Sequence, residues 1–185
     1  MYNHSYPVFI HHIFTSPEHN YFTREKFDGG DAQTLEHAQI NLHKDRGLEG
    51  DRFEFSKYPI TLISAEVIDE ISKELGFEAD PKLFRRNIVI SGIHLNSLIG
   101  KKFYLGGVLC EGIAHCAPCT WMNAVIAKET YKLMKGRGGL RIKILEGGSL
   151  ELAETTIESD KEITFDPLTP LSRPKIPSFD FSKEL

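Results

Sequence analysis

The sequence contains few cysteines and no long apolar run, and both shortages narrow its class. Three cysteines in 185 residues is a small and odd count, whereas secreted domains usually carry even numbers as disulfide staples. No stretch reaches the roughly 18 consecutive apolar residues that a membrane-spanning helix needs. No positively charged segment precedes an apolar run near residue 1. These absences predict a cytoplasmic protein that does not enter a membrane.

An excess of basic residues is also missing. The 22 Lys and Arg residues are outnumbered by 26 Asp and Glu residues, which gives a formal net charge of −4. A chain with this balance has no general positive field of the kind that attracts polyanions, so we expect no nucleic-acid partner. Hydrophobic residues make up 41% of the chain, which is enough for a core of ordinary size in one domain.

Hydrophobic periodicity predicts many short strands and two helices. The first helix starts after Ser64, a good cap residue, and ends at Gly76. The pair Gly106-Gly107 suits the tight turn of a hairpin. Strands connected by hairpins, rather than regular alternation with helices, indicate a mixed α/β but β-dominated fold, a barrel or a curled sheet. The expected strands are at 7–14, within 37–55, at 60–63, 85–93 and 140–146, and two within 101–114, with helices at 65–75 and 118–134.

The domain is expected to occupy residues 1–155. Its signal fades after Glu151, and "FDPLTPLSRPKIPSFDF" holds four prolines without a sustained period. We therefore expect residues 156–185 to form a proline-rich C-terminal extension.

Two of the three cysteines lie three positions apart in "EGIAHCAPCTWMNAV". Pro118 is favoured as the first residue of a helix, which would place Cys119 in the first turn. Backbone N–H groups there lack intrahelical partners and favour an anion, so the pattern predicts a lowered pKa for the Cys119 thiol and a reactive thiolate. His115 could add positive charge or transfer a proton.

Other interpretations of Cys116 and Cys119 remain open. Both can be small buried hydrophobes, as free cysteines often are, and Cys110 fits a core position in its strand. A structural zinc site is less favoured, because no second C-x-x-C or H-x-x-x-H pair is present. A thioredoxin-type disulfide is disfavoured by the preceding hairpin, since that motif normally occurs in a βα context.

Beyond these residues, "LFRRNIVISGIHLNSLIGKKFYLGGVLCEGIAHCAPCTWM", followed by "GRGGLRIKILEGGSL", resembles the MOSC domain, which is named for the C-terminal domain of molybdenum cofactor sulfurase. The earlier "INLHKDRGLEGDRF" and "ITLISAEVI" occur where that family has its G-x-x-G-D-R turn and first helix. The resemblance covers residues 7–150. It implies a β-barrel-like fold with a few flanking helices and a reactive cysteine.

The resemblance also implies roles for individual residues. The cysteine that carries sulfur or coordinates molybdenum in the family matches Cys119, and two pterin-binding residues of amidoxime-reducing relatives match Arg85 and Asn87. An Arg can bind a cofactor phosphate with two parallel hydrogen bonds, and Asn can pair with ring amides. The structural alternatives are a solvated pair for Arg85 and Arg86, a turn for Asn87, and a purely structural G-x-x-G-D-R turn, which we favour for residues 47–52.

Two functions follow as expectations. In the first, the chain binds the molybdenum cofactor as part of a reductase, Cys119 ligates the metal, and a redox partner and a small-molecule substrate are needed. In the second, Cys119 carries a persulfide received from a sulfur donor protein. Pyridoxal phosphate, used by full-length cofactor sulfurases on a separate domain, is not supported here.

Overall fold

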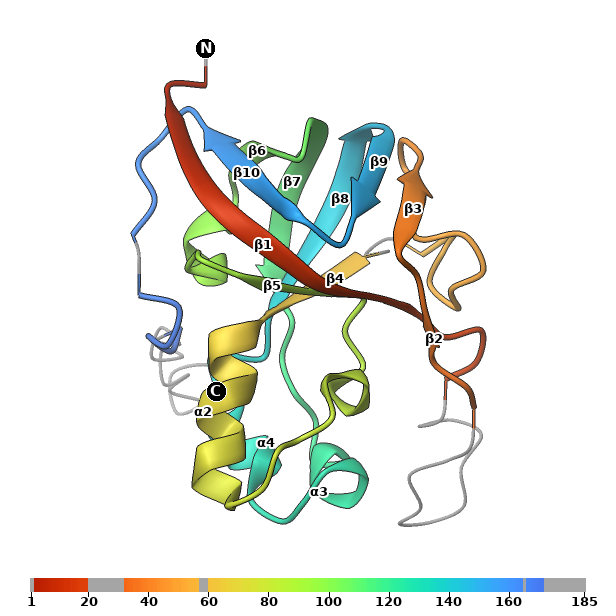
Figure 1. Ribbon diagram of the computed structural model, residues 1–185, viewed down its shortest axis with the longest axis vertical. Coiled ribbons are helices and arrows are strands. Elements are labelled where there is room, and N and C mark those ends of the chain that lie inside the picture. Colours follow the sequence, from red (N-terminus) through yellow and green to blue (C-terminus); the bar gives the residue numbers. More distant parts are fainter. Residues whose placement is uncertain (1, 20–31, 57–59, 165, 172–185) are drawn as a thin grey trace, which may run out of the picture.

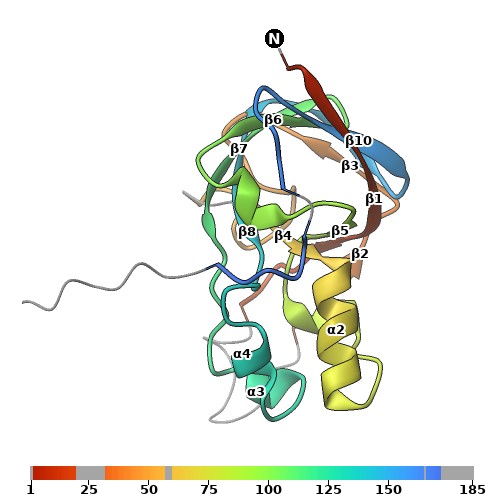
Figure 2. The same cartoon turned by 90° about the vertical axis from the view of Figure 1, so that its left-hand side faces the viewer.

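A closed barrel of seven strands forms most of the molecule, and the helices gather below one end of it (Figures 1 and 2). The computed structural model describes residues 2–19, 32–56, 60–164 and 166–171. The last part of the expected extension, from residue 172, lies outside this range. The strands are β1 (His4–Thr15), β2 (Leu35–Glu36), β3 (Gln39–Leu42), β4 (Ile60–Ser64), β5 (Ile88–Ser91), β6 (Lys102–Leu105), β7 (Val108–His115), β8 (Leu140–Glu146), β9 (Gly148–Glu151) and β10 (Glu154–Ser159).

The barrel runs in the order β10-β6-β7-β8-β4-β5-β1, and pairing of β1 with β10 closes it. Only β4 and β5 pair in parallel among these neighbours, and the chain between them includes α2 (Ala65–Leu75) and the 3₁₀ turn η1 (Pro81–Phe84). β2 extends β1 at one edge, and β3 pairs with β9 in a separate two-stranded sheet. The predicted β-dominated, barrel-like fold is therefore confirmed.

Two apolar cores lie along the long axis of the molecule. The barrel interior is filled by alternate residues of its strands, such as Leu140, Ile142 and Ile144 of β8, all fully buried. A second cluster packs α2 against the segment that holds Trp121 and Met122. The site described below lies where these two cores meet.

Local signals in the sequence account for α2 and the β6–β7 hairpin. The Ser64 hydroxyl accepts a hydrogen bond from the Val67 N–H, and Gly76 ends the helix in the left-handed conformation with φ +77°. Gly106 and Gly107 also have positive φ, +54° and +81°, at the hairpin turn. These predictions are confirmed.

The expected helix over 118–134 is wrong. Two four-residue helices replace it, α3 (Met122–Val125) and α4 (Thr130–Leu133), separated by Glu129 with φ +78°. Side chains here form hydrogen bonds with backbone groups that a continuous helix would pair. The side-chain oxygen of Asn123 accepts from the Tyr131 N–H, and the Thr130 hydroxyl donates to the Ala127 carbonyl. Cys119 precedes α3 and does not lie in a helical first turn, so that argument for its activation is lost.

The expected boundary at residue 155 falls inside β10. This strand pairs with β1 on one side and with β6 on the other, and its Ile157 is fully buried. Ile163, beyond the strand, also belongs to the barrel core. In this structure, part of the expected extension therefore completes the barrel.

Candidate functional site

A cavity of about 250 Å³ opens between the barrel and the helical end of the molecule. Its walls come from the turn after β3, the junction of η1 and β5, the first residues of β4 and β8, and the cysteine loop that follows β7. Arginines and cysteines dominate its polar surface. The described residues that line it are His19, Arg52, Phe53, Thr61, Arg85, Arg86, Cys116, Ala117, Cys119, Trp121, Met122 and Arg141.

The three thiols differ in their access to this cavity. Cys110 is fully buried in β7, and burial raises the pKa of its thiol to about 12. Cys116 is 2% exposed and Cys119 is exposed, and both line the cavity. Cys110 is thus a core residue, as predicted. Cys119 is the accessible thiol of the three.

Residues 116–119 run without a turn or a bend. Three residue steps of extended chain span roughly 10 Å, whereas the Cα atoms of a disulfide lie about 4.4–6.8 Å apart. A bond between Cys116 and Cys119 would therefore require the backbone to move. Both thiols are free in this structure.

Two glycines of the "GRGG" segment support the cysteine loop. The Cys116 N–H donates to the Gly139 carbonyl at 2.7 Å. A Cβ on Gly138 would lie 2.4 Å from the Cys116 carbonyl oxygen and 2.8 Å from Cδ of Pro118, and one on Gly139 would lie 2.0 Å from the Leu62 carbonyl oxygen. These approaches leave no room for a side chain, so the segment has a packing role beyond ending a helix.

Arg52 holds a charge that the surrounding protein only partly balances. Its Nη1 lies 3.6 Å from the Asp51 carboxylate and 3.4 Å from the Ser16 carbonyl oxygen, and its guanidinium stacks on Phe53. Its Nε is buried and has no hydrogen-bond partner within the part of the chain that the structure describes. A buried donor without a partner is costly, and such groups often mark a site where a ligand supplies the missing acceptor.

The arginines depress one another's pKa values. Burial, followed by the nearby charge of Arg52, lowers the pKa of Arg85 to about 10, and Asp51 opposes this shift. Burial and then Arg86 likewise lower the pKa of Arg52. Burial first, with Arg52 and Arg85 next, lowers the pKa of His19. Burial is the main cause of each shift and the neighbouring arginines add to it, so an anionic ligand would stabilise the charged forms of these groups.

Arg85 and Arg86 both line the cavity, but they differ from the strand pair that the sequence suggests. Arg85 has φ +59° and ends η1 rather than lying in a strand. Its guanidinium donates to the Thr34 hydroxyl and the Glu18 carbonyl, both at 3.1 Å.

Arg86 donates to the carbonyl oxygens of Gly138, Phe84 and Cys116, and therefore fixes the cysteine loop. The solvated-pair alternative is wrong for Arg86, which is 8% exposed.

Asn87 is buried beside the cavity and its amide is fully engaged. Its carbonyl oxygen accepts from the N–H and the hydroxyl of Thr61, and its NH₂ donates to the Phe14 carbonyl and the Asp51 carboxylate. Asp51 also accepts from the N–H groups of Ser16 and Phe53. Both amide hydrogens and both acceptor positions are used. Asn87 thus holds Asp51 in place, and Asp51 links its own turn to the chain at Ser16.

Sequence reasoning missed Arg52 and Arg141 as lining residues. Arg52 belongs to the G-x-x-G-D-R turn, which the sequence suggests is structural, and Arg141 reads as a solvent-facing position of the alternating strand β8. No local sequence pattern predicts that these two side chains line the cavity. They reach it only after β4, β5 and β8 have come together in the folded protein.

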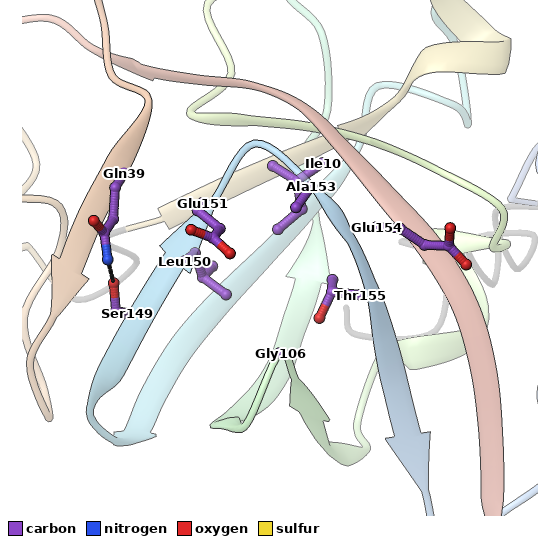
Figure 3. Close-up of a pocket in the computed structure, with 9 residues that line it drawn as sticks. All are labelled: Ile10, Gln39, Gly106, Ser149, Leu150, Glu151, Ala153, Glu154 and Thr155. Atoms are coloured by element: carbon purple, nitrogen blue, oxygen red, sulfur yellow. Dashed lines mark hydrogen bonds between the residues drawn. The ribbon is translucent and has the colours of Figure 1, made fainter.

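A second hollow, of about 220 Å³, lies away from the helices between β9, β10 and the β6–β7 turn (Figure 3). Gln39 donates to the Ser149 hydroxyl at one side of it, and Leu150 and Ala153 lie near its centre. Its described lining contains no thiol, histidine or arginine. The chemistry predicted from the cysteines therefore belongs to the arginine-lined cavity.

Comparison with known proteins identifies the family. The family model of the MOSC domain matches residues 25–163. The chain belongs to the MOSC domain family. Among solved structures, YuaD from Bacillus subtilis matches with a TM-score of 0.66 at 15% identity, over 85% of this chain and 99% of that one. YiiM from Escherichia coli matches with a TM-score of 0.57 at 17% identity, over 89% of this chain and 74% of that one.

A third similar structure is YiiM from Geobacillus stearothermophilus, with a TM-score of 0.61 at 15% identity over 83% of this chain and 75% of that one. At these identities the likeness shows the MOSC fold and carries no residue roles. Among proteins of curated function, no match is found. Within the described residues, no helix is long and apolar enough to span a membrane.

Proposed function

We propose that this MOSC domain binds the molybdenum cofactor in the arginine-lined cavity, with Cys119 as the thiolate ligand of the metal, as a component of a cofactor-dependent reductase. One observation carries the proposal: Cys119, the exposed thiol of the three, lies at a cavity that four arginines line. A soft thiolate suits a thiophilic metal, and guanidinium groups suit a phosphate.

The chemistry of the donor set fits such a cofactor in part. Arg52, with its unpartnered buried Nε, and Arg85, whose pKa is lowered to about 10, would hold the phosphate. Cys119 would hold the metal, which when bound supplies two-electron redox chemistry for reducing a small-molecule substrate. Asn87 does not fit as a direct ligand, because the protein already uses all four of its hydrogen-bonding positions. We therefore assign Asn87 to positioning Asp51.

Pyridoxal phosphate fits this cavity poorly. That cofactor is held as a Schiff base on a lysine, and the described residues lining the cavity include four arginines but no lysine. The arginines alone could bind its phosphate but provide no amine for the linkage.

The second candidate function is sulfur transfer, in which Cys119 carries a persulfide received from a donor protein. The exposure of Cys119 favours this candidate, since a donor cysteine must reach the acceptor thiolate directly. The neighbouring arginines would stabilise the anionic persulfide. The cavity volume of about 250 Å³ is also small beside the roughly 300–1,000 Å³ of typical ligand pockets.

Elemental analysis distinguishes the two functions. Protein purified from a host that makes the cofactor should carry molybdenum near one atom per chain, and Cys119→Ser should remove it. Cys116→Ala, a change in the same loop at the buried thiol, is the matched control and should retain most of the metal. Cyanide-labile sulfur without molybdenum, lost in Cys119→Ser, would instead establish the sulfur carrier. Equal loss of metal from both variants would contradict a role specific to Cys119.

A further inference from the structure

A third cavity lies on the other side of the cysteine loop. Its volume is about 280 Å³, and the described residues that line it are His115, Pro118, Tyr131, Lys135, Gly136 and Leu171. It shares none of these with the arginine-lined cavity. Pro118 contributes to this cavity, while its neighbours Ala117 and Cys119 line the other one. The cysteine loop therefore separates two hollows, of which the proposed function uses one.

The hydrogen-bond network fixes the orientation of the His115 ring. The Asn96 NH₂ donates to the Gly136 carbonyl at 2.8 Å, which directs its own carbonyl oxygen towards Nδ1 of His115 at 3.3 Å. An amide oxygen only accepts hydrogen bonds, so Nδ1 of His115 must carry the proton. The contact with Asn96 thus fixes both the tautomer and the orientation of the ring at the cavity wall.

The polar lining of this cavity is positive. The Lys135 ammonium lies 5.2 Å from the centre of the Tyr131 ring, a cation–π contact that holds it near the aromatic wall. No Asp or Glu is among the described lining residues. Pro118, Leu171 and the Tyr131 ring supply apolar surface. The cavity thus combines one fixed cation and an oriented imidazole with an apolar wall.

The chain before residue 172 forms one wall of this cavity. The Leu171 N–H donates to the Gly136 carbonyl at 2.9 Å. Gly136 has φ +73°, and a Cβ there would lie 2.9 Å from both the Leu171 nitrogen and Cβ of Pro170. The close contact requires glycine at this position, so the wall formed by Leu171 is a packed part of the structure.

We propose that this cavity is a binding site for a small carboxylic acid with an apolar body. Its carboxylate would accept a hydrogen bond from the Lys135 ammonium, while its body packs on Pro118, Tyr131 and Leu171. The volume, near the lower end of ligand pockets, suits a molecule of about the size of a single ring. The site is independent of the proposed cofactor, and its occupant would contact the loop that carries Cys119.

Benzoate, titrated into the full chain and followed by NMR, tests this site. We expect saturable shifts of the His115, Tyr131 and Lys135 signals, and binding of neutral benzyl alcohol at least about tenfold weaker, because the alcohol has no negative charge to pair with the Lys135 ammonium. Lys135→Gln should weaken benzoate binding about tenfold or more, while Lys132→Gln should not. Lys132 lies on α4, one short turn before Lys135, pairs with Glu129 and is 78% exposed, which makes it the matched control.

Three results would overturn the site: no saturable shifts, equal benzoate affinity in Lys135→Gln, or shifts confined to Arg52 and Cys119, which would place benzoate in the other cavity. Lys135 is exposed, so its variant is expected to fold, and unchanged amide signals in the barrel check this. The titration involves no molybdenum or persulfide, so its failure is distinguishable from failure of the proposed function.

Discussion

At the scale of single residues, the arginines of the site divide into structural and ligand-binding groups. Arg86 donates to three backbone carbonyl oxygens and pins the cysteine loop. Arg52 has a buried Nε without a partner among the described residues, and burial and Arg86 disfavour its charged form. A residue with a buried unpartnered donor that lines a cavity is expected to serve binding rather than stability.

Substitution of Arg86 should therefore lower stability, whereas substitution of Arg52 should lower cofactor affinity. Arg86→Ala should lower the free energy of unfolding by about 3 kcal/mol or more, since three hydrogen bonds from a charged group are lost. Arg52→Ala should leave the urea midpoint nearly unchanged, yet lower cofactor affinity about tenfold to a hundredfold, and Arg52→Lys should restore only part of it. Urea unfolding and molybdenum content per chain measure the two effects. Marked destabilisation by Arg52→Ala with unchanged cofactor content would reverse the assignment.

Which of these residues the sequence could predict depends on how local their signals are. Cys119 and Arg85 were found through the family resemblance, and both line the cavity. Asn87 was found through the same motif, but its four hydrogen bonds link it to Phe14, Asp51 and Thr61. Those partners are distant in sequence, so no local pattern could show that the amide is already engaged.

At the scale of elements, the cysteine loop and the "GRGG" segment behave as one unit. Gly138 packs against the Cys116 carbonyl and Pro118, and Gly139 accepts from the Cys116 N–H. Neither contact involves the thiols themselves. The position of Cys119 at the cavity therefore depends on backbone packing that starts about twenty residues further along the chain.

Gly138→Ala should displace this loop. Its Cβ would meet the Cys116 carbonyl oxygen at 2.4 Å, so we expect a lower melting temperature and faster alkylation of Cys116, which the wild-type fold protects at 2% exposure. The control is Gly107→Ala in the β6–β7 turn, where nothing lies within 4 Å of the added Cβ. It should cost only about 1 kcal/mol from its positive φ. Protection of Cys116 equal to that of the wild type in Gly138→Ala would contradict the linkage.

The elements that sequence reasoning found and missed also differ physically. α2 was predicted because its cap, its apolar face and its terminal glycine all lie within the helix or next to it. The 118–134 segment has helical periodicity, but Asn123 and Thr130 satisfy backbone groups that a continuous helix would use. β10 was missed because its partners, β1 and β6, are remote in sequence and its own residues alternate only weakly.

At the scale of the whole molecule, β10 closes the barrel between β1 and β6. We infer that a chain ending at residue 155 will not unfold cooperatively, because it loses both sets of strand pairs and the buried Ile157. A chain ending at residue 171 keeps both sets of strand pairs and should unfold cooperatively. Thermal melts followed by circular dichroism compare the two. A cooperative transition of the shorter chain at the full-length temperature would restore the domain boundary at 155.

The central claim joins this barrel, its arginine-lined cavity and Cys119 into one metal-binding centre. X-ray absorption at the molybdenum edge tests it most directly, on protein purified from a host that makes the cofactor. The account predicts that the Cys119 sulfur is bound to molybdenum in the wild type and in Cys116→Ala. Any metal retained by Cys119→Ser should therefore have one sulfur ligand fewer. Molybdenum bound with the same sulfur coordination in the wild type and in Cys119→Ser would contradict the claim.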